Sequence, residues 1–312
     1  MSLKVEKVHT CSGHNAALYA LAPGRTNRHF LSAGGDGWVV EWDLDDPDLG
    51  KLVASVETQC FSLCALPDPN RIVAGNMNGG LHWIDRESSD LTRNVLHHKK
   101  GVYAMESMDF FAHSRPDKGP WLFSAGGDGF LTRWDVANAR SIESLQLSHQ
   151  ALRALSFSEK RNEIAVGASD QSIYLLDAET LAVKRILTHA HTNSVFTLAY
   201  SPDGRNLMSG GRDAMLRVWD LDQDCALRSE QPAHLYTINH LVFSPDGSLF
   251  ATASRDRTLK IWDSETFELL KVVDTLRLGG HTRSVNRLLW LPDSLISCGD
   301  DRLAMIWNIT AQ

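Results

Sequence analysis

The amino-acid sequence predicts an all-β fold, a closed ring of seven four-stranded sheets. Six stretches end in Trp, Leu or Ile six residues after an Asp, and a seventh has Asn in place of the Asp. A period of about 40–45 residues with this ending is typical of one blade of a β-propeller. Seven such units account for nearly all 312 residues, and their closing residues are Trp42, Ile84, Trp134, Leu176, Trp219, Trp262 and Trp307.

Within a unit, short alternating strands are separated by turn residues. In the fifth unit, Ser194–Tyr200 is the first expected strand, and Ser201–Gly204 (SPDG) is a turn with Pro second and Gly fourth. The second strand is expected at Asn206–Gly210, the third at Met215–Asp220 and the fourth at Ala226–Glu230. No segment carries a helical apolar period long enough to compete with the strands.

The units resemble WD40 repeats, whose Trp-Asp ending occurs at residues 42–43, 134–135, 219–220 and 262–263. The resemblance covers essentially the whole chain and implies one domain over residues 1–312. The last repeat ends without an outer strand, whereas Lys4–Thr10 precedes the first repeat and alternates suitably for one. The resemblance therefore implies that the N-terminal strand completes the seventh blade. The repeats are expected to end near Asp43, Asp85, Asp135, Asp177, Asp220, Asp263 and Asn308.

The composition of the chain indicates in which cellular compartment it works and which classes of partner it binds. A net charge of −7 argues against nucleic acid, because such binding rests on clustered Lys and Arg. The N-terminus has no apolar core typical of a signal peptide, and the longest apolar runs have the length of strands, so we expect no membrane partner. Five scattered cysteines without C-x-x-C spacing favour reduced, mostly buried thiols. We expect a monomeric chain in the cytoplasm, or in the nucleus of a eukaryote.

A His, a Ser or Thr, an Asp and a Trp recur at matching places in five repeats. One such set could be read as a Ser-His-Asp catalytic triad, but five copies of one active site are implausible. In WD40 blades this tetrad is a buried hydrogen-bond chain that rigidifies the blade. We therefore expect a protein that is not an enzyme, with tetrads His14-Ser32-Asp36-Trp42, His98-Ser124-Asp128-Trp134, His191-Ser209-Asp213-Trp219, His234-Thr252-Asp256-Trp262 and His281-Ser297-Asp301-Trp307.

The second and fourth repeats depart from this pattern. The fourth keeps His149 and Asp170 but has Val166 and Leu176 at the other two places. In the second, Glu57 lies near the His place, and the other places hold Ala74, Asn78 and Ile84. We expect both blades to rely on packing and to be the softest of the ring.

The sequence offers little support for a metal or another cofactor, and we expect neither. The pairs His97-His98 and His189-His191 are the nearest approach to a metal motif. One member of each pair belongs to a tetrad, and no carboxylate or cysteine lies at ligand spacing beside them.

The resemblance also implies a binding surface on the narrow top face of the ring. In WD40 repeats the residues three and five after the His, and the one before the Asp, point to that face. Aligning the second repeat from Glu57 places Cys60 and Ser62 there. Aromatic residues and Arg are enriched at binding hot spots. The partner-binding residues that we expect are Tyr19, Met77, Tyr103, Arg153, Phe196, Arg212, Asn239, Arg255, Asn286 and Asp300.

Three of these residues, Arg153, Arg212 and Arg255, fall on successive repeats and could receive an acidic or phosphorylated segment. The alternative is that they pair with neighbouring carboxylates. Two irregular loops, Asp109–Trp121 and Asp43–Gly50, should lie on the opposite, bottom face, and such insertions often carry partner contacts.

The function that the sequence favours is a non-catalytic scaffold that binds a protein or peptide on its top face. The alternative within that class is a constitutive subunit of a larger assembly. An alternative of another class is a propeller enzyme or a carbohydrate-binding protein. A carbohydrate binder should show aromatic platforms on one face, but most tryptophans belong to tetrads, and the others, Trp38, Trp83, Trp121 and Trp290, share no obvious surface.

Overall fold

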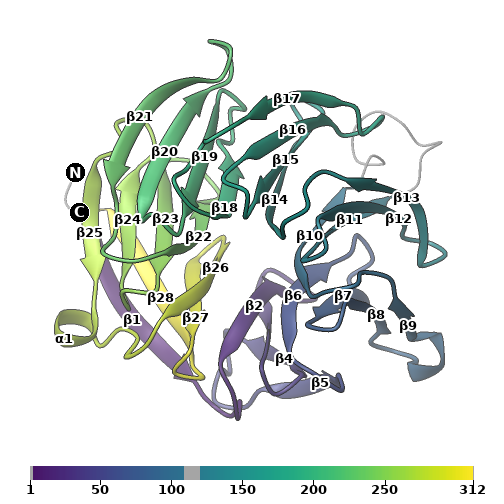
Figure 1. Ribbon diagram of the computed structural model, residues 1–312. Coiled ribbons are helices and arrows are strands. Elements are labelled where there is room, and N and C mark those ends of the chain that lie inside the picture. The colour runs from purple at the N-terminus through teal and green to yellow at the C-terminus, as the bar shows by residue number, and fades with distance from the viewer. Residues whose placement is uncertain (1–2, 109–119, 312) are drawn as a thin grey trace.

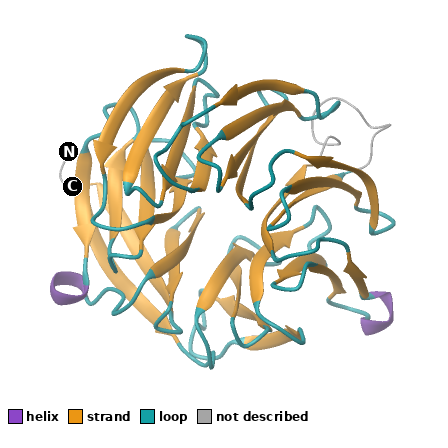
Figure 2. Ribbon diagram, in the orientation of Figure 1, coloured by secondary structure: helices purple, strands orange, loops and turns teal. Residues whose placement is uncertain are grey.

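The computed structural model describes residues 3–108 and 120–311, which form seven four-stranded antiparallel sheets arranged in a ring (Figure 1). Apart from two short helical turns, η1 (Ser89–Leu91) and α1 (Thr275–Leu278), the regular structure of these residues is β-strand (Figure 2). The sequence prediction of a seven-bladed propeller is therefore confirmed. We number the blades by repeat and call the face with the turns between second and third strands the top face.

Each blade runs from an innermost strand at the ring centre to an outer strand at the rim. The innermost strands are β2 (Leu18–Pro23), β6 (Cys60–Ala65), β10 (Val102–Met108), β14 (Leu152–Ser158), β18 (Val195–Tyr200), β22 (Ile238–Phe243) and β26 (Val285–Leu291). The second strands are β3 (His29–Gly34), β7 (Arg71–Asn76), β11 (Trp121–Gly126), β15 (Glu163–Ala168), β19 (Asn206–Gly211), β23 (Leu249–Ser254) and β27 (Ser294–Gly299).

The remaining strands lie toward the rim. The third strands are β4 (Trp38–Asp43), β8 (Gly80–Asp85), β12 (Phe130–Asp135), β16 (Ile173–Asp177), β20 (Met215–Asp220), β24 (Leu259–Asp263) and β28 (Ala304–Ala311). The outer strands are β5 (Lys51–Ser55), β9 (Arg93–Leu96), β13 (Arg140–Gln146), β17 (Val183–Leu187), β21 (Ala226–Pro232), β25 (Leu269–Val273) and β1 (Leu3–Cys11).

The hydrophobic core lies between the blades. One cluster joins Phe123 and Leu131 of blade 3 to Ile164 and Leu176 of blade 4. Both faces of each sheet are therefore covered by the neighbouring sheets, and burial of apolar area between them holds the ring together. This packing explains why the second and third strands are almost continuously buried, whereas the outer strands β5, β9, β13, β17 and β21 contain no buried residue.

The two ends of the chain close the ring in blade 7. Strand β1 pairs antiparallel with β28, with Val5 opposite Ile309 and Cys11 opposite Ala304. The predicted closure by the N-terminal strand is confirmed. The pairing covers the edge of β28, and β1 becomes the outer edge of the blade, where its charged residues Lys4, Glu6 and Lys7 disfavour edge-to-edge association.

Arginines bridge several blade boundaries away from the top face. Arg86 of blade 2 makes a buried ion pair with Glu41 of blade 1, with 2.5 Å between Nη2 and Oε1. Arg161 of blade 4 donates from Nη2 to the carbonyl oxygen of Leu221 in blade 5 at 3.2 Å. These guanidinium groups are used in holding neighbouring blades together.

Candidate functional site

The five predicted tetrads are connected hydrogen-bond chains. In blade 5, Trp219 Nε1 donates to Ser209 Oγ at 2.9 Å, and Ser209 Oγ lies 2.8 Å from His191 Nε2. An indole nitrogen can only donate, so the hydroxyl hydrogen points to the imidazole. The chain then ends at Asp213, 2.9 Å from His191 Nδ1. The other four chains are formed by His14, Ser32, Asp36 and Trp42; His98, Ser124, Asp128 and Trp134; His234, Thr252, Asp256 and Trp262; and His281, Ser297, Asp301 and Trp307.

These chains are built for rigidity. The Ser209 hydroxyl is fully buried and both of its hydrogen-bonding roles are taken, so it cannot reach a substrate. Burial by itself would raise the pKa of Asp213, but hydrogen bonds and charge from His191 and Arg217 outweigh it and lower the pKa. Asp213 also accepts from the backbone N–H of Thr192 at 3.1 Å. The tetrad therefore fastens the loop before the innermost strand to the turn after the second strand.

Blade 4 has a substitute network, and the expectation that it relies on packing is wrong. Ser148, four residues before β14, stands where the five tetrad blades have His, and its hydroxyl donates to Asp170 Oδ2 at 2.6 Å. The Tyr174 hydroxyl donates to the same oxygen at 2.7 Å. His149, which the sequence suggested for this role, instead contacts Gln146 Nε2 through Nδ1 at 3.2 Å.

Blade 2 also has a substitute network, so the same expectation is wrong here. Asn76 Oδ1 accepts from the backbone N–H groups of Asn78 and Gly80 at 2.9 and 2.8 Å. Its Nδ2 donates to His82 Nε2 at 2.9 Å. The place of the tetrad His, four residues before β6, is held by the buried Val56 and not by the neighbouring Glu57.

This one-residue shift changes which residue of blade 2 faces the centre of the top face. Cys60 and Ser62, suggested by the alignment from Glu57, are buried. Phe61, half-buried between them, holds the equivalent place. Sequence reasoning missed Phe61 because the second repeat has no His to mark the start of its innermost strand.

Seven residues from equivalent places surround the top of the ring centre, and we call them the central ring. Each is the second residue of its innermost strand, where the register with the second strand shifts by one. A bulge of this kind leaves its residue out of the ladder and re-aims the side chain. The central ring consists of Tyr19, Phe61, Tyr103, Arg153, Phe196, Asn239 and Asn286.

Five members of the central ring form a continuous row of aromatic contacts from blade 1 to blade 5. Ring centroids lie 5.5 Å apart both for Tyr19 with Phe61 and for Phe61 with Tyr103. The Arg153 guanidinium lies 4.4 Å from the Tyr103 centroid and 5.2 Å from that of Phe196. Arg153 is therefore held by cation–π contacts, and its Nε donates to Ser169 Oγ at 3.1 Å.

The other two members are used to fasten blades 6, 7 and 1. Asn239 Nδ2 donates to the Val285 carbonyl oxygen at 2.8 Å. Asn286 Nδ2 donates to the Leu18 carbonyl oxygen at 2.8 Å and to Asp300 Oδ1 at 2.7 Å. These bonds use both N–H donors of Asn286, so its most direct role is to join blades.

The remaining sequence-predicted site residues lie on the tight turns of the top face. Met77, Arg212 and Arg255 each precede the tetrad Asp or its equivalent and are exposed. Arg212 and Arg255 make no ion pair with any described residue, whereas Arg153 belongs to the aromatic row. The three arginines therefore do not form one uniform set of free cations.

Three further ionisable residues that sequence reasoning missed lie deeper on the innermost strands. Glu106 on β10 and Arg287 on β26 come from blades 3 and 7 and influence each other electrostatically. Burial raises the pKa of Glu106 to about 7, and Arg287 acts in the opposite direction. On β22, His240 Nδ1 accepts from the backbone N–H of Leu288 at 3.2 Å. Nothing in the sequence around Glu106 indicates that this carboxyl is buried or that it lies near Arg287 of another blade.

Other expectations concern loops, metals and membranes. The acidic turn after β4 is tied back by an ion pair between Arg28 and Asp45, whereas most of Asp109–Trp121 lies outside the described residues.

Across residues 3–108 and 120–311 no group of three or more His, Cys, Asp or Glu is placed to hold a metal ion. In the same part of the chain no helix is long and apolar enough to cross a membrane. All five cysteines are unpaired, and four are buried.

Comparison with known proteins gives matches in line with this geometry. A family model described as "WD domain, G-beta repeat" matches residues 5–43, 183–220, 226–263 and 271–308. The stretch between the first two matches contains both blades that lack a tetrad. The same stretch also contains blade 3, which has a complete tetrad.

Three curated relatives show the level of similarity. The B-type cell cycle switch protein ccs52B of Medicago truncatula is 29% identical over 213 residues, 66% of this chain and 41% of that protein. An Arabidopsis thaliana protein named "Cell division cycle 20.6, cofactor of APC complex" is 27% identical over 209 residues, 63% of this chain and 46% of that protein. The "Protein LST8 homolog" of Drosophila melanogaster is 29% identical over 187 residues, 59% and 57% of the two chains.

The chain thus spans less than half the length of the first two relatives. Four matches to one repeat model and seven four-stranded blades, five of them with the complete tetrad, lead to one conclusion. The chain belongs to the WD40-repeat family.

Proposed function

We propose that this chain is a non-catalytic adaptor that binds a segment of a partner protein across the centre of its top face. The observation that carries the proposal is the row of contacts from Tyr19 through Phe61, Tyr103 and Arg153 to Phe196. Aromatic side chains and Arg provide large contact areas with few rotatable bonds, and they dominate binding hot spots. Half-buried rings of this kind keep a free face for a partner.

The surrounding network favours this role over catalysis. The His and Ser or Thr side chains of the tetrads are buried, and the hydroxyls are engaged at both ends. The same tetrads hold the top-face loops in one conformation, which lowers the entropic cost of binding. Similarity to a protein named as a cofactor of the APC complex supports a role in protein interaction.

A permanent place in a larger assembly is the second candidate. The human relative named "THO complex subunit 6" is 25% identical over 151 residues, 45% of this chain and 41% of that protein, and its name describes a subunit. An assembly subunit would remain bound at high salt and would not exchange. An adaptor would bind its partner reversibly.

The experiment compares tagged wild-type chain with a Phe61→Ala/Tyr103→Ala variant in affinity purification from the organism that encodes the chain, with mass spectrometry of what is retained. Leu49→Ala, at an exposed bottom-face position, is the control. We expect the principal partner to be lost from the ring variant alone, while that variant keeps a single cooperative unfolding transition. Equal recovery with all three chains would refute a binding site at the central ring.

A further inference from the structure

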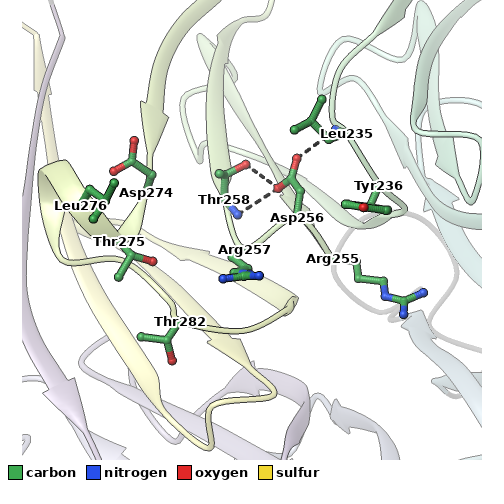
Figure 3. A pocket seen from close by; sticks show the side chains of 10 residues that line it. All are labelled: Leu235, Tyr236, Arg255, Asp256, Arg257, Thr258, Asp274, Thr275, Leu276 and Thr282. Atoms are coloured by element: carbon green, nitrogen blue, oxygen red, sulfur yellow. Dashed lines mark hydrogen bonds between the residues drawn. The ribbon is translucent and has the colours of Figure 1, made fainter.

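A groove runs along the top face between blades 6 and 7. It encloses about 900 Å³. Leu235 and Tyr236, from the loop before β22, lie on one side, Thr275 and Leu276 of α1 lie on the other, and Arg257 lies between them (Figure 3). The groove exists because α1 is added to the loop between β25 and β26.

Both walls present apolar side chains to solvent. Leu235 is 84% exposed, Tyr236 61% and Leu276 96%. Single exposed apolar residues are ordinary on a protein surface, but here three of them face one groove from two repeats. Burying such side chains against a partner would release about 25 cal/mol per Å² of apolar area.

The groove and its inward continuation also carry arginines that are not paired with an acidic side chain. Arg255 and Arg257 line it, and Arg283 lies where it continues inward. These three arginines make no ion pair with any residue in the described part of the chain. Three carboxylates line the same hollows, but each is held by other donors: Asp256 accepts from His234 and Thr258, Asp274 from the backbone N–H of Arg277, and Asp300 from Asn286.

The groove walls are held in place by the tetrads. The backbone N–H of Leu235 donates to Asp256 Oδ2 at 3.0 Å, which fastens one wall to the turn beside Arg257. On the other wall, Thr275 Oγ1 donates to the His281 carbonyl oxygen at 2.5 Å, and the Thr282 N–H donates to Asp301 at 3.0 Å. A partner would meet a shape that already exists, so little ordering is required on binding.

The groove leads toward the central ring. A second hollow of about 400 Å³ shares Arg255, Arg257 and Thr282 with the first and extends to Ser284 and Asp300. The Ser284 hydroxyl donates to Asn286 Oδ1, a member of the central ring, at 2.9 Å. One extended segment could therefore occupy the groove and continue across the ring.

We propose that this groove binds an acidic segment of a partner protein, in which a large apolar side chain is flanked by two or more carboxylates. The apolar side chain would lie between Leu235, Tyr236 and Leu276, and the carboxylates would pair with Arg255, Arg257 and Arg283. This inference deepens the proposed adaptor function, because it gives the chemistry of the segment and a second place of contact. Attraction of this kind weakens as salt rises, because exposed charges are screened.

The probe is a library of random peptides displayed on phage and selected on the immobilised wild-type chain. Selected peptides are then labelled and titrated by fluorescence anisotropy against four variants. Two alter the groove, Arg257→Glu/Arg283→Glu and Leu276→Ser. A third, Phe61→Ala, alters the central ring. The fourth, Arg140→Glu/Arg205→Glu, makes the same change in net charge at exposed positions on other surfaces.

We expect selection of peptides that carry Asp or Glu around a large apolar residue. Their affinity should fall at least about tenfold with the arginine variant, which corresponds to about 1.4 kcal/mol. It should fall clearly with Leu276→Ser and stay unchanged with the charge control. Selection of basic peptides, no enrichment of any peptide, or equal binding by the groove variants and wild type overturns the groove.

The same titrations separate this inference from the proposed function. Peptides that lose affinity with Phe61→Ala but not with either groove variant support the central ring and refute the groove. Peptides insensitive to all four variants refute both. Displacement of the peptides by single-stranded oligothymidylate would show that the cations serve nucleic acid, which also overturns the proposal.

Discussion

Replacing Asp213 with Ala should be among the most damaging single changes on the top face. The carboxylate accepts from His191 Nδ1 at 2.9 Å, from Arg217 Nη1 at 2.9 Å and from the backbone N–H of Thr192 at 3.1 Å. The His191 side chain is fully buried and that of Arg217 nearly so. The substitution removes this acceptor from the buried His191 and Arg217 side chains, although Arg217 keeps its ion pair with Glu230.

The expected loss follows from those contacts. A buried donor without a partner costs about 1–3 kcal/mol, and breaking a buried ion pair from one side costs about 3–5 kcal/mol. We expect a loss of about 3–5 kcal/mol in the free energy of unfolding. Asp213→Asn, which keeps one acceptor oxygen, should lose less.

The matched control is Asn78→Ala in blade 2. Asn78 holds the equivalent place on its turn, but it is exposed, and the turn is capped by the side chain of Asn76. Exposed positions of this kind usually change stability by about half a kcal/mol or less. Urea unfolding followed by tryptophan fluorescence and by circular dichroism gives both values. Equal midpoints for the two variants would refute the role assigned to the tetrad.

Four further predictions test closure, packing, pH dependence and partner binding. Deleting Met1–Thr10 removes most of β1 and exposes the edge of β28, so the truncated chain should aggregate; a soluble monomer with an unchanged melting curve would contradict the closure. Trp134→Phe should destabilise the chain by about 1–2 kcal/mol more than Trp83→Phe, because Trp134 Nε1 donates to Ser124 Oγ, whereas the buried Trp83 Nε1 has no partner among the described residues; equal unfolding free energies would sink this account. The pKa of Glu106 is raised in the fold from 4.5 to about 7, so its effect on stability is favourable below pH 4.5 and is lost as pH rises through 7. The free energy of unfolding of Glu106→Gln should therefore rise by about 1–3 kcal/mol relative to that of wild type when the pH is raised from 4 to 8. A difference between the two proteins that stays constant over this range would exclude the burial argument. Charge reversal at Arg212 and Arg255 together should abolish binding of the principal partner with the fold intact, whereas removal of Ser114–Gly119, which lies outside the described residues, should leave binding unchanged; the opposite pattern would place the binding site on the bottom face.

Much of the architecture could be predicted because its signals are local and repeated. In five repeats the Asp and Trp lie six residues apart on one turn and strand, so a spacing in the sequence is also a spacing in the blade. Closure was readable for the same reason: a repeat without an outer strand needs one, and Lys4–Thr10 has the pattern of a strand. Such features depend on hydrogen bonds and pleats within a single blade.

The site was less accessible, because its parts meet only across blades. Phe61 joins the aromatic row through a bulge in β6, and the repeat that contains it lacks the His that marks the register elsewhere. Arg153 looks like a free cation in the sequence, yet it lies between Tyr103 and Phe196 from the two neighbouring blades. A repeat alignment counts residues along the chain and cannot supply such contacts.

The groove between blades 6 and 7 shows the same division. From the sequence, Leu235 and Leu276 are two apolar residues in separate loops, and Arg257 is one turn residue among many. Their meeting depends on the rotation that relates one blade to the next and on α1, which brings Leu276 to the rim of the top face (Figures 1 and 3). The number of blades, the hydrogen-bond chains of the five tetrad blades and the closure of the ring could be read from the sequence, because each is encoded within one repeat or at the chain ends. The side chains that share a surface are known from the folded ring alone, because their meeting depends on the packing of one blade against the next.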